Sequence, residues 1–125
     1  MEENTFLEAA ENGDIENVKK HIENGADVNT SDEHDRTALM KAAKHGHLDV
    51  VQYLLDHGAE VNNRDNRGTS ALYWASSNGF DAIVQLLIQH HSDVSVMDDR
   101  GWTAKDQASS HDYEGIVNML EKAGA

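Results

Sequence analysis

The sequence repeats itself every 33 residues, and this periodicity restricts the fold more than any other feature. Shifting the chain by one period brings glycine, alanine, valine and aspartate positions into register. The aligned columns are Gly13, Gly46, Gly79; Ala9, Ala42, Ala75, Ala108; Val18, Val51, Val84, Val117; Asp32, Asp65, Asp98; and Val28, Val61, Val94. We therefore divide residues 1–125, as a single domain, into four units at about 1–31, 32–64, 65–97 and 98–125.

Each unit is typical of two short helices followed by an extended turn. In the second unit, Thr37 is a natural N-cap, because its hydroxyl can accept a hydrogen bond from the first helical turn. One helix is predicted over 38–44 and ends at Gly46, and another over about 48–57 ends at Gly58. The second helix carries an apolar stripe of Val50, Val51, Leu54 and Leu55. Two such helices cannot bury these faces alone, so the units must stack into an all-α solenoid with one shared core.

Composition removes several classes of function. The 125 residues include no cysteine, which excludes disulfides, thiol catalysis and zinc held by cysteine. Lys and Arg number 10 against 23 Asp and Glu, and a net charge of −13 argues against nonspecific binding of nucleic acid. The longest apolar runs are far shorter than the ~20 residues that cross a bilayer. The acidic first residues lack a signal-peptide pattern, so we expect a cytoplasmic or nuclear protein. We also expect the protein to be mostly monomeric.

The second unit carries the motif that identifies a family. It reads D-E-H-D-R-T from Asp32, then A-L-M-K-A-A, H-G-H, V-V, L-L, G-A and V-N, and the third unit repeats most of these positions. This pattern resembles the ankyrin repeat over nearly the whole chain. The resemblance implies four stacked helix-turn-helix units with short hairpin-like loops. It also implies a non-catalytic protein-protein interaction module that binds another protein through a concave groove.

The chain departs from the family pattern in ways that affect stability and the ends of the stack. The proline that usually starts the first helix is replaced by Ala38, Ala71 and Ala104, and the family's histidine by Met40, Tyr73 and Asp106. Asp35 and His91 stand where glycine is usual. Polar residues of the fourth unit (Lys105, Asp106, Glu121) predict an outer cap, and Asn4, Thr5 and Glu8 a capping signal for the first helix.

Metal binding and catalysis find little support in the sequence. Eight histidines are present, but His57 and His90 are one repeat apart, on stacked helices roughly 8–10 Å apart, too far for easy co-ligation of zinc. No nucleophile motif, phosphate-binding glycine loop or H-E-x-x-H occurs. We therefore expect no catalytic residue, no metal and no cofactor. A metal protein or enzyme is the least favoured hypothesis.

The resemblance places a set of exposed side chains in the groove. Two aromatic residues are ambiguous there: packing is favoured for Trp74, whereas Trp102 either covers its own turn or is an exposed interface anchor. The principal groove candidates are Arg36, Lys41, Lys44, His45, Arg67, Trp74, Ser77, Asn78, Arg100, Trp102 and His111.

The full set of groove positions has a charge pattern. It holds six basic and four acidic side chains and five of the eight histidines, so its net charge is +2 with histidine neutral. The rest of the chain then carries a net charge of −15. One interpretation is that acidic residues merely keep the convex face soluble. The other is that the groove receives an acidic or mixed-charge segment of a partner, and binds it more strongly below about pH 6.5 as histidines gain charge.

Two functions of the protein-binding kind follow, a general interaction module and an intracellular inhibitor or regulator of an enzyme or transcription factor. The sequence does not name the partner. The resemblance also implies that Asn29 and Asn62 would be substrates for asparagine hydroxylation if the source is an animal.

Overall fold

The structure, a computed structural model, describes the backbone of residues 2–125 and the side chains of residues 5–125. The described residues form eight helices and no extended strand, which confirms the predicted all-α class. Each predicted unit contains one helix pair. The helices are α1 (Glu2–Asn12), α2 (Ile15–Glu23), α3 (Ala38–Lys44), α4 (Leu48–Asp56), α5 (Ala71–Ser77), α6 (Asp81–Gln89), α7 (Ala104–Ser110) and α8 (Glu114–Lys122).

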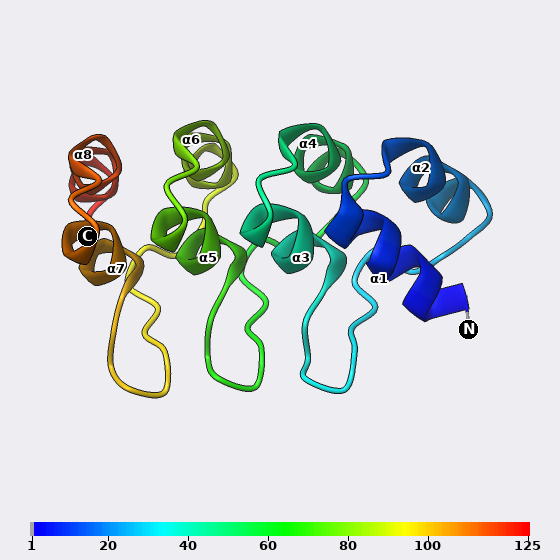
Figure 1. The fold of residues 1–125 in the computed structure, drawn as a ribbon, viewed down its shortest axis with the longest axis horizontal. Helices are drawn as coiled ribbons and strands as arrows, with labels where there is room; N and C mark the ends of the chain where they lie inside the picture. The colour runs from blue at the N-terminus through cyan, green and yellow to red at the C-terminus, as the bar shows by residue number, and fades with distance from the viewer. Residues whose placement is uncertain (1) are drawn as a thin grey trace.

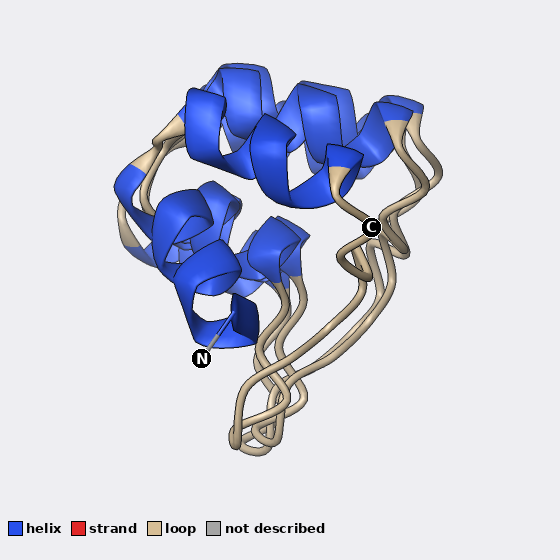
Figure 2. Ribbon diagram, turned by 90° about the vertical axis from the view of Figure 1, so that its right-hand side faces the viewer, coloured by secondary structure: helices blue, strands red, loops and turns tan. Residues whose placement is uncertain are grey.

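The helices lie in two layers that run the length of the molecule (Figure 1). The odd-numbered helices α1, α3, α5 and α7 form an inner layer, and the even-numbered helices form an outer layer above it in this view. Three hairpins, over residues 24–37, 57–70 and 90–103, connect the units and project away from the outer layer beside the inner helices (Figure 2). The two ends of the chain lie at opposite ends of the stack.

Local signals in the sequence set several helix boundaries. The Thr37 hydroxyl accepts a hydrogen bond from the Met40 amide, at 3.3 Å, and α3 spans the predicted residues 38–44. Helix α4 ends at Asp56, one residue before the prediction, because His57 is its C-cap. The capping prediction for the first helix is wrong: α1 begins at Glu2, which places Thr5 inside the helix, and the side chain of Asn4 lies outside the described residues.

Alanines and valines of the repeat columns form the continuous core. Ala42, Ala75 and Ala108 are fully buried where successive inner helices approach each other. The glycine column has a second role besides ending helices, because Gly46 packs against the ring of Phe80 in the next unit. A Cβ at Gly46 would lie 2.8 Å from that ring. Gly13 meets His47 and Gly79 meets Tyr113 in the same way, so each glycine receives a ring from the following unit.

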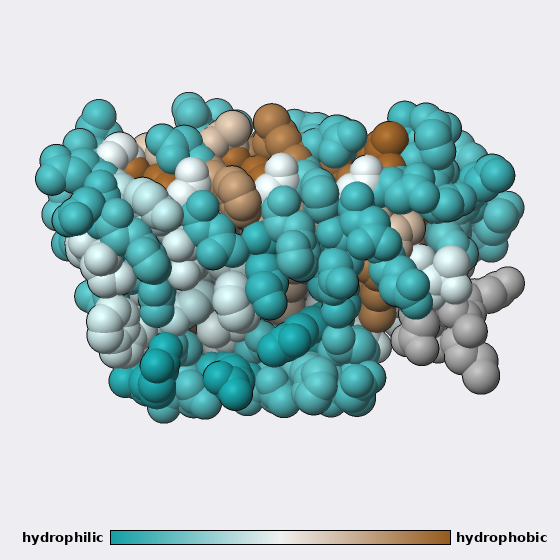
Figure 3. Space-filling view, in the orientation of Figure 1, coloured by the Kyte–Doolittle hydropathy of each residue, from teal (hydrophilic) through white to brown (hydrophobic). Residues whose placement is uncertain are grey.

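The face seen in Figure 3 is mainly hydrophilic over the hairpins, and its apolar atoms gather towards the outer-helix layer. Three large apolar side chains are exposed among the described residues: Leu48, Met97 and Trp102. No described helix combines the length and the apolar character needed to cross a membrane.

Candidate protein-binding site

Aspartates of the repeat column build the turns that carry the hairpin tips. One Asp32 carboxylate oxygen accepts the amides of His34 and Arg36, at 2.9 and 3.0 Å. Asp65 and Asp98 repeat this arrangement in the second and third hairpins, each with two amides at 2.9 Å. The aspartate therefore holds the turn closed, which fixes the position of the residues at its tip.

The exposed positions of the inner helices fall into rows across the units, because the units repeat every 33 residues. One row crosses the middle of the helices, and two more cross their C-terminal ends; together the three rows hold seven of the eleven principal groove candidates. The rows are Lys41, Trp74 and Gln107; Lys44, Ser77 and Ser110; and His45, Asn78 and His111.

Lys41 is not a free cation. Its amine lies 3.1 Å from a carboxylate oxygen of Asp32 and 3.5 Å from one of Glu11, and its side chain is only 17% exposed. Burial alone would raise the pKa of Asp32, but the amides of Arg36 and His34 and the Lys41 amine outweigh it and lower that pKa. A small cavity of about 220 Å³ beside this lysine is lined mostly by acidic residues, namely Glu8, Glu11, Asp32 and Glu33, together with Leu7. The exposed side of the inner helices is therefore acidic near α1.

Lys44 has a different environment. Its amine lies over the ring of Trp74, 4.7 Å from the ring centroid, and no carboxylate pairs with it among the described residues. Trp74 is half-buried and meets Tyr73 edge to face, with 5.9 Å between the ring centroids. The Asn78 side-chain amide donates to the Lys44 carbonyl at 2.8 Å, which ties α5 to α3. The Trp74 ring therefore packs against Tyr73 on one side and remains partly exposed. The Lys44 ammonium group over the indole is a favourable cation–π arrangement.

A polar network joins α5, α7 and the third hairpin next to Trp74. The Tyr73 hydroxyl donates to Asp98 at 2.6 Å and accepts from the Gln107 amide at 2.7 Å. The Ser77 hydroxyl donates in turn to Gln107 at 3.3 Å. Burial and the bond to Asp98 raise the pKa of Tyr73, so it remains a hydrogen-bond donor.

Asp98, the centre of this network, is buried and ionised. Burial by itself raises its pKa, but the Tyr73 hydroxyl and the amides of Trp102 and Arg100 lower it to about 2. Sequence reasoning missed Tyr73 and Asp98 as a pair. The signal was the replacement of the family's histidine by tyrosine at position 73, one unit before an aspartate that recurs in every hairpin.

The predicted hairpin arginines divide into paired and unpaired groups. The Arg36 Nε lies 3.7 Å from Asp65, and Arg100 lies 3.6 Å from Asp98. Arg64 donates to the carbonyls of Gly68 and Met97. Arg67 is exposed and its guanidinium has no partner among the described residues. Of the six basic side chains predicted for the groove, only Lys44 and Arg67 thus lack an anionic or carbonyl partner in the described part of the chain.

The histidines are distributed more widely than the groove prediction assumes. His45 and His111 are exposed at the ends of α3 and α7, stacked on His47 and Tyr113 respectively. His57 and His90 are two of the five histidines counted among the predicted groove positions, and the structure places them as the C-caps of outer helices. In the part of the chain with described side chains, no three His, Asp or Glu residues gather closely enough to hold a metal ion.

Asn29 and Asn62 connect the units. The Asn29 side chain accepts the Glu60 amide at 2.8 Å and donates to the Gly58 carbonyl at 3.4 Å. Asn62 makes the same two contacts one unit later, with Asp93 and His91. Both side chains therefore already hold the following turn, and their hydroxylation stays a prediction.

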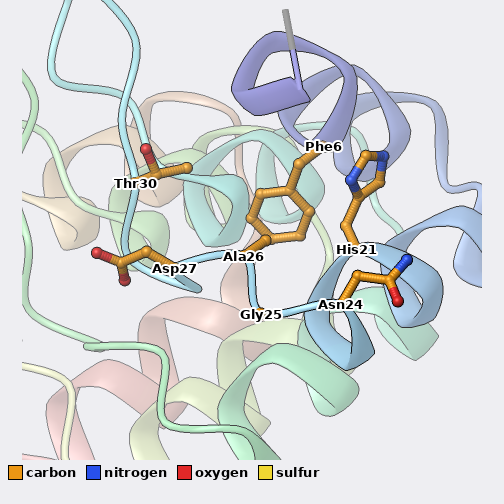
Figure 4. Close-up of a pocket in the computed structure, with 7 residues that line it drawn as sticks. All are labelled: Phe6, His21, Asn24, Gly25, Ala26, Asp27 and Thr30. Atoms are coloured by element: carbon orange, nitrogen blue, oxygen red, sulfur yellow. The ribbon is translucent and has the colours of Figure 1, made fainter.

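A separate cavity of about 360 Å³ lies at the N-terminal end, between α1, α2 and the first hairpin (Figure 4). The ring of Phe6 lies between His21 and the turn at Gly25, with 6.0 Å between the Phe6 and His21 rings. Asn24, Ala26, Asp27 and Thr30 complete the lining. No nucleophile with a base in hydrogen-bond reach lines this cavity, so its geometry gives no support to a catalytic role.

Comparison with known proteins agrees with this architecture. A search of curated proteins finds no match. The family model for ankyrin repeats (3 copies) matches residues 6–98 and, in a second overlapping match, residues 64–125. These matches cover nearly the whole chain and the repeated helix pairs described above. The proteins of this family are generally protein-protein interaction modules and typically non-catalytic, and the chain belongs to the ankyrin-repeat family.

Proposed function

We propose that this protein binds an extended, mixed-charge segment of a partner protein across the inner surface, which we define as the exposed side of the inner helices together with the tips of the first two hairpins. The observation that carries the proposal is the contrast between two lysines one helical turn apart. Lys41 is neutralised by two carboxylates, whereas Lys44 lies on Trp74 and pairs with no carboxylate among the described residues.

Lys44 and Trp74 form an anchor point for an acidic side chain. A partner carboxylate can pair with the amine while its neighbouring atoms contact the indole, so that burial strengthens the ion pair. Arg67, unpaired at the second hairpin, adds a second cation for the same segment.

The acidic end of the inner surface sets the direction of the partner. Glu8, Glu11 and Glu33 surround the neutralised Lys41 there. A segment with acidic residues at one end and basic residues at the other therefore matches the surface from α5 to α1, whereas a uniformly acidic segment would be repelled at α1. This refines the sequence-based prediction of an acidic or mixed-charge partner to a mixed-charge one.

The experiment is affinity capture from native lysate with two charge-matched double variants. Lys44→Ala with Arg67→Ala removes the two unpaired cations of the inner surface. Lys20→Ala with Lys122→Ala removes two exposed cations from α2 and α8 and changes the net charge by the same amount. We expect the first pair to lose the partner at least about tenfold, with unchanged helical circular dichroism, and the second pair to keep it. Equal retention by both variants would contradict the proposal.

The consequence of binding separates a passive module from a regulator. An assay of the captured partner's own activity, with and without this protein, distinguishes the two. Inhibition that disappears with Lys44→Ala and Arg67→Ala would identify a regulator that blocks an enzyme or a transcription factor.

A further inference from the structure

Neighbouring inner helices are bridged at the same two repeat positions in every unit. The bridging pairs, in order along the stack, are Glu11 with Lys41, Lys44 with Trp74, and Ser77 with Gln107. The first bridge is an ion pair of 3.5 Å, the second places an ammonium group 4.7 Å from a ring centroid, and the third is a hydrogen bond of 3.3 Å. All six residues are partly exposed, so the inner surface carries one accessible bridge over each gap between inner helices.

The three bridges differ in charge. At the first, two carboxylates share the Lys41 amine and two further glutamates line the cavity beside it, so this bridge is anionic. At the second, the Lys44 ammonium pairs with no carboxylate among the described residues. At the third, the Gln107 amide donates to Tyr73 and its oxygen accepts from Ser77, which leaves an uncharged bridge with oxygen lone pairs still available. A complementary partner therefore presents a cation, an anion and a neutral donor in that order.

The distance between the bridges follows from the packing of the inner helices. Ala42, Ala75 and Ala108 are fully buried where these helices meet. Packed helices lie roughly 8–10 Å apart, and small side chains at the contact favour the shorter distances. Because the bridges use the same two positions in every unit, they repeat along the stack at this helix spacing.

Of the regular backbone conformations, polyproline II matches this distance best. It repeats every third residue with a rise of about 3.1 Å per residue, so side chains on one face are about 9.3 Å apart. A β-strand presents one face at intervals of about 6.7 Å. An α-helix returns to one face after about 5.4 Å, or after seven residues and about 10.5 Å, and neither value fits alanine-lined contacts.

We propose that the partner segment crosses the inner helices in the polyproline II conformation, with every third residue over one bridge. A basic residue lies at the first bridge, an acidic residue at the second and a neutral hydrogen-bond donor at the third. This inference rests on the proposed inner-surface function and adds the backbone conformation and the residue pattern of its partner. Proline suits the intervening positions because it fixes φ near the required value, and the partly exposed Trp74 ring offers the aromatic surface on which such segments dock.

The test uses synthetic peptides with blocked ends that carry arginine, glutamate and serine separated by prolines. Three peptides place these groups two, three or four residues apart. At the three-residue spacing, a fourth peptide exchanges the arginine and the glutamate, and a fifth replaces the prolines by alanine, which favours a helix. Fluorescence anisotropy measures the affinity of each peptide for the 125-residue wild type and for Lys44→Ala with Arg67→Ala.

We expect the proline peptide with three-residue spacing to bind the wild type at least about tenfold more tightly than the other four, and to lose this advantage on the double variant. Equal affinity at all spacings, or tighter binding of the alanine peptide, overturns the polyproline II proposal. If those peptides still bind the double variant more weakly, the proposed inner-surface function stands without it. Binding that the double variant leaves unchanged, or no binding of any peptide, contradicts both.

Discussion

Helices α5 and α7 occupy equivalent places in adjacent units, yet α5 buries five of its seven residues and α7 only two. Both begin at a hydroxyl residue and end at the same distance from it. In α7 the first turn is closed by a capping box between Thr103 and Asp106. Ser70, the N-cap of α5, makes no side-chain capping bond, so α5 forms without this local signal, and the comparison shows that the following unit supplies the burial. Most of the stability of a unit should therefore depend on its neighbour.

The largest effect is expected at the position that is Leu72 in α5 and Lys105 in α7. Leu72 is 1% exposed, so Leu72→Ala should lower the free energy of unfolding by about 3 kcal/mol, through lost burial and the cavity left behind. Lys105→Ala removes only a surface ion pair with Glu121 and should cost less than about 1 kcal/mol. Urea unfolding followed by circular dichroism measures both. Similar losses at the two positions would contradict the comparison.

A smaller loss of unfolding free energy is expected when the hydrogen bond from Tyr73 to the ionised Asp98, which joins the two units, is removed. Tyr73→Phe removes the hydroxyl that donates to buried Asp98 and should cost about 2 kcal/mol. Tyr113→Phe is the matched control, because the Tyr113 hydroxyl makes no hydrogen bond among the described residues, and it should change stability by less than about 0.5 kcal/mol. The unfolding free energies at neutral pH test this difference.

The same substitution has a defined pH dependence. The pKa of Asp98 is lowered from 3.8 to about 2, so its contribution is complete above pH 3.8 and is lost as the pH falls towards 2. Protonation of Asp98 weakens its bond with Tyr73, and the stability difference between wild type and Tyr73→Phe should narrow over that range. A difference that stays constant down to pH 2 would show that the bond to the ionised carboxylate is not its source.

Helices α5 and α7 each have a serine at the equivalent position, and these two serines sharpen the comparison. The Ser76 hydroxyl is buried in α5 and has no hydrogen-bond partner among the described residues, whereas Ser109 in α7 is exposed. Both Ser→Ala changes gain the same helix propensity. Ser76→Ala should in addition relieve an unsatisfied polar group and stabilise by about 1 kcal/mol more than Ser109→Ala. Equal gains would mean that the Ser76 hydroxyl is satisfied.

The smallest effect on stability is expected at His91, in the turn that directly follows α6. His91 has a φ of 68°, in the region that favours glycine, and its counterparts Gly25 and Gly58 have φ of 92° and 90°. His91→Gly removes the cost of this conformation but adds chain entropy to the unfolded state, for a net gain of about 0.5 kcal/mol. His91→Ala, which keeps a Cβ, should give no gain. The melting temperatures of the two variants provide the test.

Most of the fold follows from the sequence because it depends on local and repeated features. The 33-residue columns gave the number of units, and Thr37 and Gly46 gave the bounds of α3. Asp35 and His91 were identified as replacements of glycine, and both keep the positive φ of the residue they replace. Asp112 has the same property and was not identified, because the glycine column was followed only to Gly79.

The candidate site was less predictable because its properties depend on contacts between units. Charge counting placed Lys41 and Lys44 in one basic surface, but only their distances to Asp32, Glu11 and Trp74 separate them. Trp102 could not be assigned from its position in the turn. The exposure of its side chain depends on which residues pack against the third hairpin, and these contacts exist only in the assembled stack.

The most direct test of the central claim is photo-crosslinking to the captured partner from two exposed positions, one on each layer. Asn78→p-benzoylphenylalanine places the crosslinker at the end of inner helix α5, and Gln85→p-benzoylphenylalanine places it on outer helix α6. The account predicts partner crosslinks from position 78 and none from position 85. Crosslinks from position 85 alone would place the partner on the outer helices and contradict it.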